Sequence, residues 1–174
     1  ENYIWKKYSK PFKAVGFKYF YDHDRHLSNN EELIRYFKSN KAIKFLHLKR
    51  ENLLATLFSY KRALAQQQWT RADTNYKTSI TIQECKEYFQ RILYNQKLFD
   101  KLFAGRILQI SYDNLINSTE QTLTNILDFI EVKALPLTTE TIKNKETELL
   151  DSITNYTELK NYFKYTDYAK YFNE

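Results

Sequence analysis

Hydrophobic residues along this chain follow two patterns: short apolar runs, and longer stretches with helical spacing. Three runs have the β-branched and aromatic content of strands: Ala14–Phe20, Ala42–Leu48 and Arg106–Tyr112. The second and third runs are densely apolar, as expected for interior strands that are covered on both faces. Helical patterns separate the runs. This alternation predicts an α/β fold with a parallel sheet.

Residues that typically cap helices mark where the predicted helices begin. After residue 136 the chain is predicted to be helical to its end. The caps are Ser28 or Asn30 for a helix ending at Ser39, the capping box Thr81/Glu84 for a long helix stopped by Gly105, and the box Ser118/Gln121 for a third helix.

The stretch Ile43–Ala63, IKFLHLKRENLLATLFSYKRA, joins the second predicted strand to a helix. In parallel sheets, ligands bind outside the carboxyl ends of the strands, and this strand delivers Lys49 and Arg50 to that edge. Backbone N–H groups at the start of the next helix also favour an anion there. Arginine adds a planar fork that can hold phosphate oxygens.

Stepping along the helix at its 3.6-residue period gives two stripes. One stripe is predicted to bury against the sheet, and the other, small and polar, would let a ligand approach. Arg50 and Ser59 then form a candidate phosphate clamp, although a loop arginine and a helical serine often only face water. The apolar stripe is Leu53, Leu57, Tyr60 and Leu64, and the polar one is Asn52, Thr56, Ser59 and Ala63.

The composition limits which partners and which kinds of binding site the chain can have. The 174 residues are expected to form one domain, and a net charge of +6 suggests an anionic partner such as nucleic acid, a membrane surface or a phosphorylated small molecule. With only Gly16 and Gly105, the chain has no Gly-rich phosphate loop. The single Cys85 and three histidines argue against a structural zinc site, and no metal is expected.

The chain contains no methionine, so we expect it to be a fragment or a processed product. It shows neither a membrane-spanning apolar run nor a signal-peptide pattern, and a cytoplasmic location is expected.

Four stretches, in order, resemble sulfotransferases that use 3′-phosphoadenosine-5′-phosphosulfate (PAPS). The segment FLHLKRENLLATLFSYKRALAQQQW resembles the family's 3′-phosphate-binding strand and helix, and AVGFKYFYDH is similar to the preceding strand of bacterial nodulation-type members. LQISYDNLINSTEQTLTNILDFIEV and IKNKETELLDSITNYTELKNYFKYTDY resemble later parts of the family. The resemblance implies a three-layer, P-loop-NTPase-like parallel sheet flanked by helices, with a helical C-terminal part.

The resemblance also implies roles for particular residues. Arg50 and Ser59 would hold the 3′-phosphate, Tyr112 would lie by the adenine, and Lys143 would approach the donor's phosphates. The separation of Arg50 from Ser59 is one residue longer than in many members, so whether Lys49 or Arg50 makes the contact stays open. Tyr112 could equally be a core aromatic and Lys143 a solvated lysine.

Residues 1–174 would then be a single sulfotransferase-like domain that lacks the family's N-terminal strand and 5′-phosphosulfate loop, and we expect it to be inactive alone. A histidine suits the base that takes the acceptor's proton. His23, after the first predicted strand, is the candidate, whereas His47 is expected to be a core residue whose hydrogen bonds are satisfied.

The leading expectation is an enzyme that moves a sulfuryl group from PAPS to a hydroxyl or amine acceptor. A basic, aromatic-rich module that binds nucleic acid or protein without catalysis is the alternative. The acceptor class stays open among carbohydrates, lipids, peptides and small molecules.

Overall fold

The computed structural model describes residues 12–21, 30–69, 75–133 and 149–172. These residues belong to two compact units. The first unit comprises Glu1–Lys49 and Asn95–Leu137, and the second comprises Arg50–Tyr94 and Thr138–Glu174. The expectation of one domain stays a prediction.

The first unit is built on a parallel pair of strands. β1 (Phe45–Lys49) pairs with β2 (Ile107–Ser111), with Phe45 opposite Ile107 and Lys49 opposite Ser111. Two of the three predicted strands are therefore confirmed within a few residues, and so are the parallel pairing and the α/β class. A pair of strands does not establish the three-layer, P-loop-like sheet, which stays a prediction.

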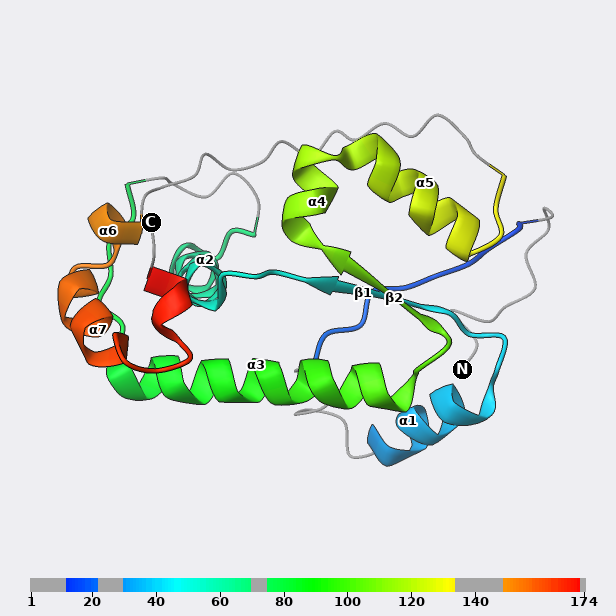
Figure 1. Ribbon diagram of the computed structural model, residues 1–174, viewed down its shortest axis with the longest axis horizontal. Helices are drawn as coiled ribbons and strands as arrows, with labels where there is room; N and C mark the ends of the chain where they lie inside the picture. The colour runs from blue at the N-terminus through cyan, green and yellow to red at the C-terminus, as the bar shows by residue number, and fades with distance from the viewer. Residues whose placement is uncertain (1–11, 22–29, 70–74, 134–148, 173–174) are drawn as a thin grey trace. The chain divides into compact units, whose positions relative to one another are not determined.

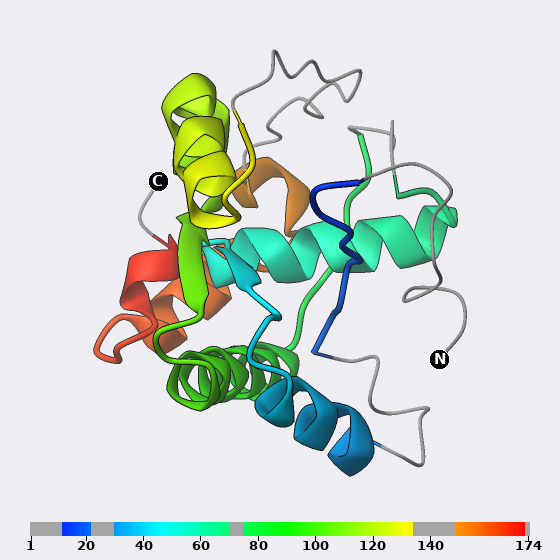
Figure 2. The same cartoon turned by 90° about the vertical axis from the view of Figure 1, so that its right-hand side faces the viewer.

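Helices lie on both faces of this pair of strands. α4 (Tyr112–Asn117) and α5 (Thr119–Phe129) pack against β2 on one face, whereas α1 (Asn30–Ser39) and the C-terminal turns of α3 (Ile82–Leu102) lie on the other (Figures 1 and 2).

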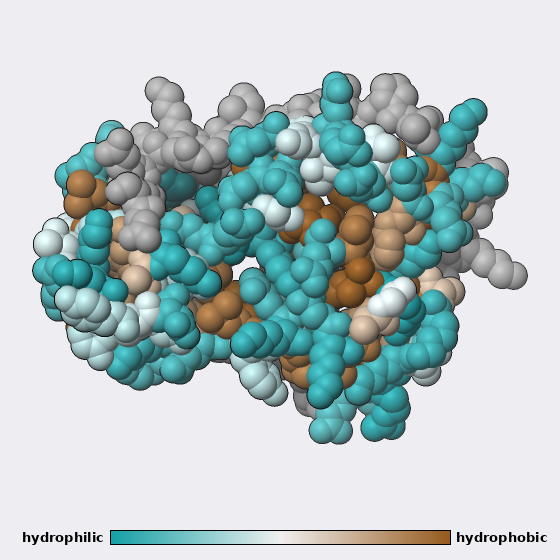
Figure 3. Space-filling model, viewed as in Figure 1, coloured by the Kyte–Doolittle hydropathy of each residue, from teal (hydrophilic) through white to brown (hydrophobic). Residues whose placement is uncertain are grey.

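Aromatic rings fill the space on the α1 and α3 side. Phe45 stacks on Phe103 with centroids 4.0 Å apart, and Phe37 meets Phe45 edge to face at 5.6 Å. Phe37 and Phe103 are almost fully buried. On the opposite face, Leu46 and Leu48 remain 44% and 50% exposed. Figure 3 shows apolar surface (brown) in the region of the two strands, on a face that is otherwise largely hydrophilic.

The predicted strand Ala14–Phe20 is wrong. Residues 12–20 are irregular, and most of their side chains are exposed. Tyr19 instead packs on Phe37 and Phe99, with centroids 5.8 and 5.9 Å apart. The β-branched and aromatic content that suggested a strand thus contributes contacts between side chains, because strand propensity measures packing on a surface rather than backbone pairing.

Arg106 connects the end of α1 to the start of β2. Its guanidinium donates to the carbonyls of Phe37, Asn40 and Ile43 at 3.0, 2.6 and 3.2 Å. It also lies over the rings of Phe45 and Phe103. Carbonyls in the last turn of a helix have no partner within the helix, so this side chain supplies donors that α1 lacks.

The second unit has its own hydrophobic core. It is formed by α2 (Leu53–Gln66), the N-terminal part of α3, α6 (Leu149–Ser152), α7 (Tyr156–Phe163) and the 3-10 helix Ala169–Phe172 (Figure 1). The helical C-terminal part is thus confirmed for residues 149–172. The buried residues are Leu53, Leu54, Leu57, Phe58, Ile80, Cys85, Phe89, Leu149, Ile153, Tyr156, Leu159, Phe163, Tyr171 and Phe172.

The buried face of α2 differs from the prediction. Leu53 and Leu57 are buried as expected, but Tyr60 and Leu64 are 42% and 51% exposed, and Ala63 is buried. Leu54 and Phe58, which directly follow Leu53 and Leu57, are buried as well. The core of this unit, made of other helices, therefore set the face that α2 buries.

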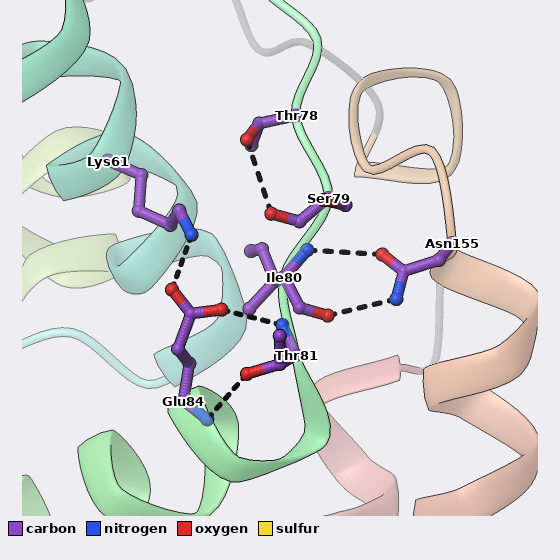
Figure 4. Close-up of polar contacts among 7 residues, drawn as sticks. All are labelled: Lys61, Thr78, Ser79, Ile80, Thr81, Glu84 and Asn155. Carbon is purple, nitrogen blue, oxygen red and sulfur yellow. Dashed lines mark hydrogen bonds and ion pairs between the residues drawn. The ribbon is translucent and has the colours of Figure 1, made fainter.

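Two of the predicted caps have different outcomes. The box before α3 is confirmed, because the Glu84 N–H donates to Thr81 Oγ1 at 3.1 Å and the Thr81 N–H donates to Glu84 Oε2 at 2.7 Å (Figure 4). Ser118 is the N-cap residue of α5, as predicted, but its side chain makes no capping hydrogen bond, so the predicted box does not form. α4 directly precedes Ser118, and the Ser118 N–H donates to Asn114 O at 2.8 Å.

Asn155 links separate segments of the second unit. Its side chain accepts from the Ile80 N–H at 3.1 Å and donates to the Ile80 carbonyl at 2.9 Å, and it makes no capping bond to α7 (Figure 4). Asn155 therefore has a structural role, and its partner is a distant backbone segment rather than its own helix. Beside it, Thr78 and Ile153 form a parallel bridge.

Candidate functional site

The site predicted on α2 lies in the second unit, at the start of that helix. Asn52 caps α2, because its side chain accepts from the Ala55 N–H at 3.0 Å. Arg50 lies just before this cap and Ser59 lies in the second turn. The Arg50 Nη1 atom donates to Ser59 Oγ across 3.5 Å, and both side chains are half-buried. The structure thus brings together the two groups that the sequence paired.

Lys49, the neighbouring cation, has a different partner. Its Nζ atom lies 2.5 Å from Asp100 Oδ2, within the first unit. Arg50, rather than Lys49, is therefore the cation seen beside Ser59. Whether Lys49 or Arg50 would contact a 3′-phosphate stays a prediction.

Of the three other predicted site residues, Tyr112 lies within the described part of the chain. Tyr112 is half-buried and begins α4, directly after β2 ends at Ser111, so it lies past the carboxyl end of a strand as expected. The Ser111 side chain caps this short helix by accepting from the Asn114 N–H at 3.4 Å. His23 and Lys143 lie outside the described residues.

A polar cluster in the first unit was not predicted. His47, in β1, places Nδ1 at 2.8 Å from Asp100 Oδ1, and its Nε2 atom hydrogen-bonds the Tyr21 hydroxyl. His47 is 8% exposed, so the expectation of a core histidine with satisfied hydrogen bonds is confirmed. Asp100, near the C-terminal end of α3, had no signal in the sequence because it stands 53 positions from His47.

The charges in this cluster are set by burial and by hydrogen bonds. Burial lowers the pKa of His47, and this effect outweighs the opposing hydrogen bond to Asp100. Burial tends to raise the pKa of Asp100, but hydrogen bonds from Lys49 and His47 outweigh it and lower that pKa. Burial, and then the charge of Asp100, raise the pKa of Tyr21. At neutral pH the cluster therefore holds a phenol, a neutral imidazole and a carboxylate.

Within the described ranges, no group of three or more His, Cys, Asp or Glu side chains could hold a metal ion. None of the helices described has the length and apolar character needed to cross a membrane.

Comparison with known proteins gives the family. A model described as "Sulfotransferase family" matches residues 16–136. The chain belongs to the sulfotransferase family. The resemblance found in the sequence is thereby confirmed.

This sulfotransferase chain is also similar to a curated protein, "Nodulation protein H" of Rhizobium tropici. The two are 29% identical over 149 residues, which cover 82% of this chain and 58% of that protein. The matched region therefore spans little more than half the length of the relative. No solved structure matched the sulfotransferase chain.

Proposed function

We propose that this chain binds the 3′-phosphate end of PAPS, as part of an enzyme that transfers the sulfuryl group to a hydroxyl or amine acceptor. Family membership and the similarity to a nodulation protein support sulfuryl transfer in general. The observation that carries the choice of donor is the contact of Arg50 with Ser59 at 3.5 Å, beside the capped start of α2.

The chemistry of these two groups suits a phosphate dianion. A distance of 3.5 Å is at the long limit for a hydrogen bond, so little is lost if each group donates to a phosphate oxygen instead. The guanidinium supplies charge and a planar pair of donors, the serine supplies a hydroxyl, and the helix dipole favours negative charge at the same end.

The remaining roles follow the family resemblance. Tyr112 is proposed to lie by the adenine, Lys143 to approach the donor's phosphates, and His23 to take the acceptor's proton. The three-layer, P-loop-like sheet and the single domain are proposed on the same ground. The proposed cofactor is PAPS without a metal ion, and the acceptor can be a carbohydrate, a lipid, a peptide or a small molecule.

The proposed reaction is an in-line displacement at sulfur. The acceptor oxygen or nitrogen forms a bond to sulfur while the bond from sulfur to the phosphate oxygen breaks, and the leaving group is 3′-phosphoadenosine-5′-phosphate (PAP). The protein contributes alignment, cations near the growing negative charge and a base for the proton.

Calorimetric titration of the full-length protein with PAP and with AMP tests the donor assignment, because AMP lacks the 3′-phosphate. We expect PAP to bind much more tightly. Losing a charge-assisted hydrogen bond costs about 1.5–3 kcal/mol, so Arg50→Ala should weaken PAP binding about 10- to 150-fold with little effect on AMP. Ser59→Ala should cost about 0.5–1.5 kcal/mol, or roughly 2- to 12-fold.

Arg35→Ala is the matched control, because it removes the same charge from an exposed position on α1. Equal affinities for PAP and AMP, or an equal loss in the Arg50 and Arg35 variants, would contradict the proposal. Preferential binding of a single-stranded oligothymidine would favour the non-catalytic interaction module instead.

A further inference from the structure

The cluster of Tyr21, His47, Asp100 and Lys49 has a defined direction of hydrogen bonding. A carboxylate can only accept, so the contact of 2.8 Å between Asp100 Oδ1 and His47 Nδ1 places the ring proton of His47 on Nδ1. The His47 Nε2 atom is then an acceptor, and the Tyr21 hydroxyl donates its proton to it. The second carboxylate oxygen of Asp100 is held by Lys49 at 2.5 Å.

Tyr21 is the residue through which a proton from outside can enter this chain of hydrogen bonds, and it is called the entrance below. His47 is only 8% exposed, whereas Tyr21 is half-buried and lies at the end of the irregular segment 12–21. The Phe99 ring packs against both, with centroids 5.5 Å from Tyr21 and 6.4 Å from His47. Because Nδ1 already carries a proton and Nε2 is bonded to the Tyr21 hydroxyl, a proton from outside reaches the accepting nitrogen through the phenol.

We propose that Tyr21, His47 and Asp100 form a proton relay for the transfer reaction, with Tyr21 as a catalytic residue facing the acceptor. As the acceptor oxygen or nitrogen forms its bond to sulfur, its proton passes to Tyr21 Oη. The phenol proton passes to His47 Nε2 in the same step, and the electron pair of the broken bond leaves with PAP. This inference rests on the proposed function.

Electrostatics in the cluster suit such a relay. The imidazolium formed on His47 is stabilised by the Asp100 carboxylate at 2.8 Å, whereas the Lys49 ammonium opposes that charge and favours release of the proton after turnover. The raised pKa of Tyr21 keeps the phenol protonated at rest, so its proton moves only in concert with proton transfer from the acceptor. Asp100 is a positioning residue that holds the His47 ring and its tautomer.

The relay assigns the acceptor's proton to a different group from His23, which is the candidate base by resemblance. The two assignments separate by substitution. If the relay operates, Tyr21→Phe removes the entrance without changing the ring packing, and turnover falls. If His23 is the base instead, Tyr21→Phe leaves turnover unchanged.

Two experiments test the relay without any sulfate donor. The first is ¹⁵N NMR of the histidines, which should find His47 neutral at pH 7 with its proton on Nδ1. A cationic ring, or a proton on Nε2, overturns the relay. This measurement needs no substitution, so it holds even if a variant fails to fold.

The second experiment uses an aryl sulfonyl fluoride, followed by mass spectrometry of the labelled tyrosines. Attack of Tyr21 Oη on the sulfonyl sulfur releases fluoride, and the phenol proton passes to His47. General-base assistance is worth about 10²- to 10⁴-fold, so His47→Gln should slow labelling of Tyr21 on the order of 100-fold. Asp100→Asn should slow it as well, because an amide that donates to Nδ1 moves the ring proton to Nε2.

Tyr19, which packs on the same Phe99, is the internal control and should be labelled slowly in every variant. The labelling rate of Tyr21 should fall as the pH drops through the pKa of His47, because the imidazolium cannot accept a proton. Equal labelling of Tyr21 and Tyr19, or a Tyr21 rate that His47→Gln leaves unchanged, indicates a structural cluster and overturns the relay.

Turnover of the full-length protein connects the relay to the reaction. With water as the acceptor, release of PAP from PAPS should fall at least about tenfold in Tyr21→Phe and stay unchanged in Tyr19→Phe. PAP affinity should stay the same in both. Loss of the donor assignment would appear as absent PAP binding in the unsubstituted protein, whereas failure of the relay would leave PAP binding intact and the labelling rates of the two tyrosines equal.

Discussion

Replacing Asn155 by alanine tests the link between α7 and the segment before α3. The Asn155 side chain accepts from the Ile80 N–H at 3.1 Å and donates to the Ile80 carbonyl at 2.9 Å (Figure 4). Ile80 is fully buried. Alanine therefore leaves two backbone groups in an apolar environment without their partner.

The expected loss in the free energy of unfolding can be estimated from these two hydrogen bonds. A buried donor or acceptor left without a partner costs about 1–3 kcal/mol, so two of them cost about 2–6 kcal/mol. Freeing the Asn155 side chain from its ordered position returns part of that cost as conformational entropy. A net loss of about 3 kcal/mol in the free energy of unfolding is expected, and it corresponds to a roughly 100-fold larger population of the opened state.

Alkylation of Cys85 by iodoacetamide gives a direct assay of this unit. Cys85 is the single cysteine, it is fully buried in the same core, and burial raises its pKa to about 12, so it reacts only when the unit opens. Asn155→Ala should speed alkylation about 100-fold. Asn155→Asp should also speed it, because it presents an oxygen to the Ile80 carbonyl.

Asn161→Ala changes an exposed asparagine of the same helix and should alter the alkylation rate by no more than about twofold. If Asn155→Ala stays within about threefold of the unsubstituted protein, the two hydrogen bonds to Ile80 do not stabilise this unit, and the reasoning is refuted.

Three further changes have expected outcomes. Arg106→Lys cannot reach the three carbonyls that Arg106 holds and should cost about 1–3 kcal/mol, seen as faster hydrogen exchange in α1. Asn52→Ala removes the cap of α2 and should lower stability by about 1 kcal/mol in urea unfolding, whereas Asn52→Asp should not. Burial tends to raise the pKa of Glu84, but hydrogen bonds from Lys61 and Thr81 outweigh it and lower that pKa from its usual 4.5. The stabilisation is therefore present above pH 4.5 and lost as the pH falls through the lower folded value. Glu84→Gln should reduce stability by less than about 1 kcal/mol at pH 6, because the pair is partly exposed. A difference that does not shrink as the pH falls below 4.5 would contradict this assignment.

The sequence predicted best where the responsible forces are local. The capping box at Thr81 and Glu84 joins residues three positions apart, and it forms as expected. Gly105 has a φ of +81°, which suits the stop predicted after α3. Arg50 and Ser59 were paired because the helical spacing of the residues after Arg50 and a family pattern bring them near each other, and they lie within 3.5 Å.

Local pattern failed where a distant partner made the choice. Ala14–Phe20 has strand-forming residues but packs its rings on helices, and α2 buries Leu54 and Phe58 rather than Tyr60 and Leu64. In each case the local sequence is compatible with more than one backbone conformation or buried face. The surrounding side chains determine which of them forms.

The sequence by itself determined the capping box of α3, the parallel pair β1 and β2 and the family, because these depend on residue types at short spacings. Only the tertiary structure decided that Asp100 hydrogen-bonds His47, which lies 53 positions away in the sequence. It also decided that the Asn155 side chain bonds the Ile80 backbone rather than capping its own helix. Such contacts join segments far apart along the chain, and a hydrogen bond between them is specified only once the packing of both segments has placed a donor opposite an acceptor.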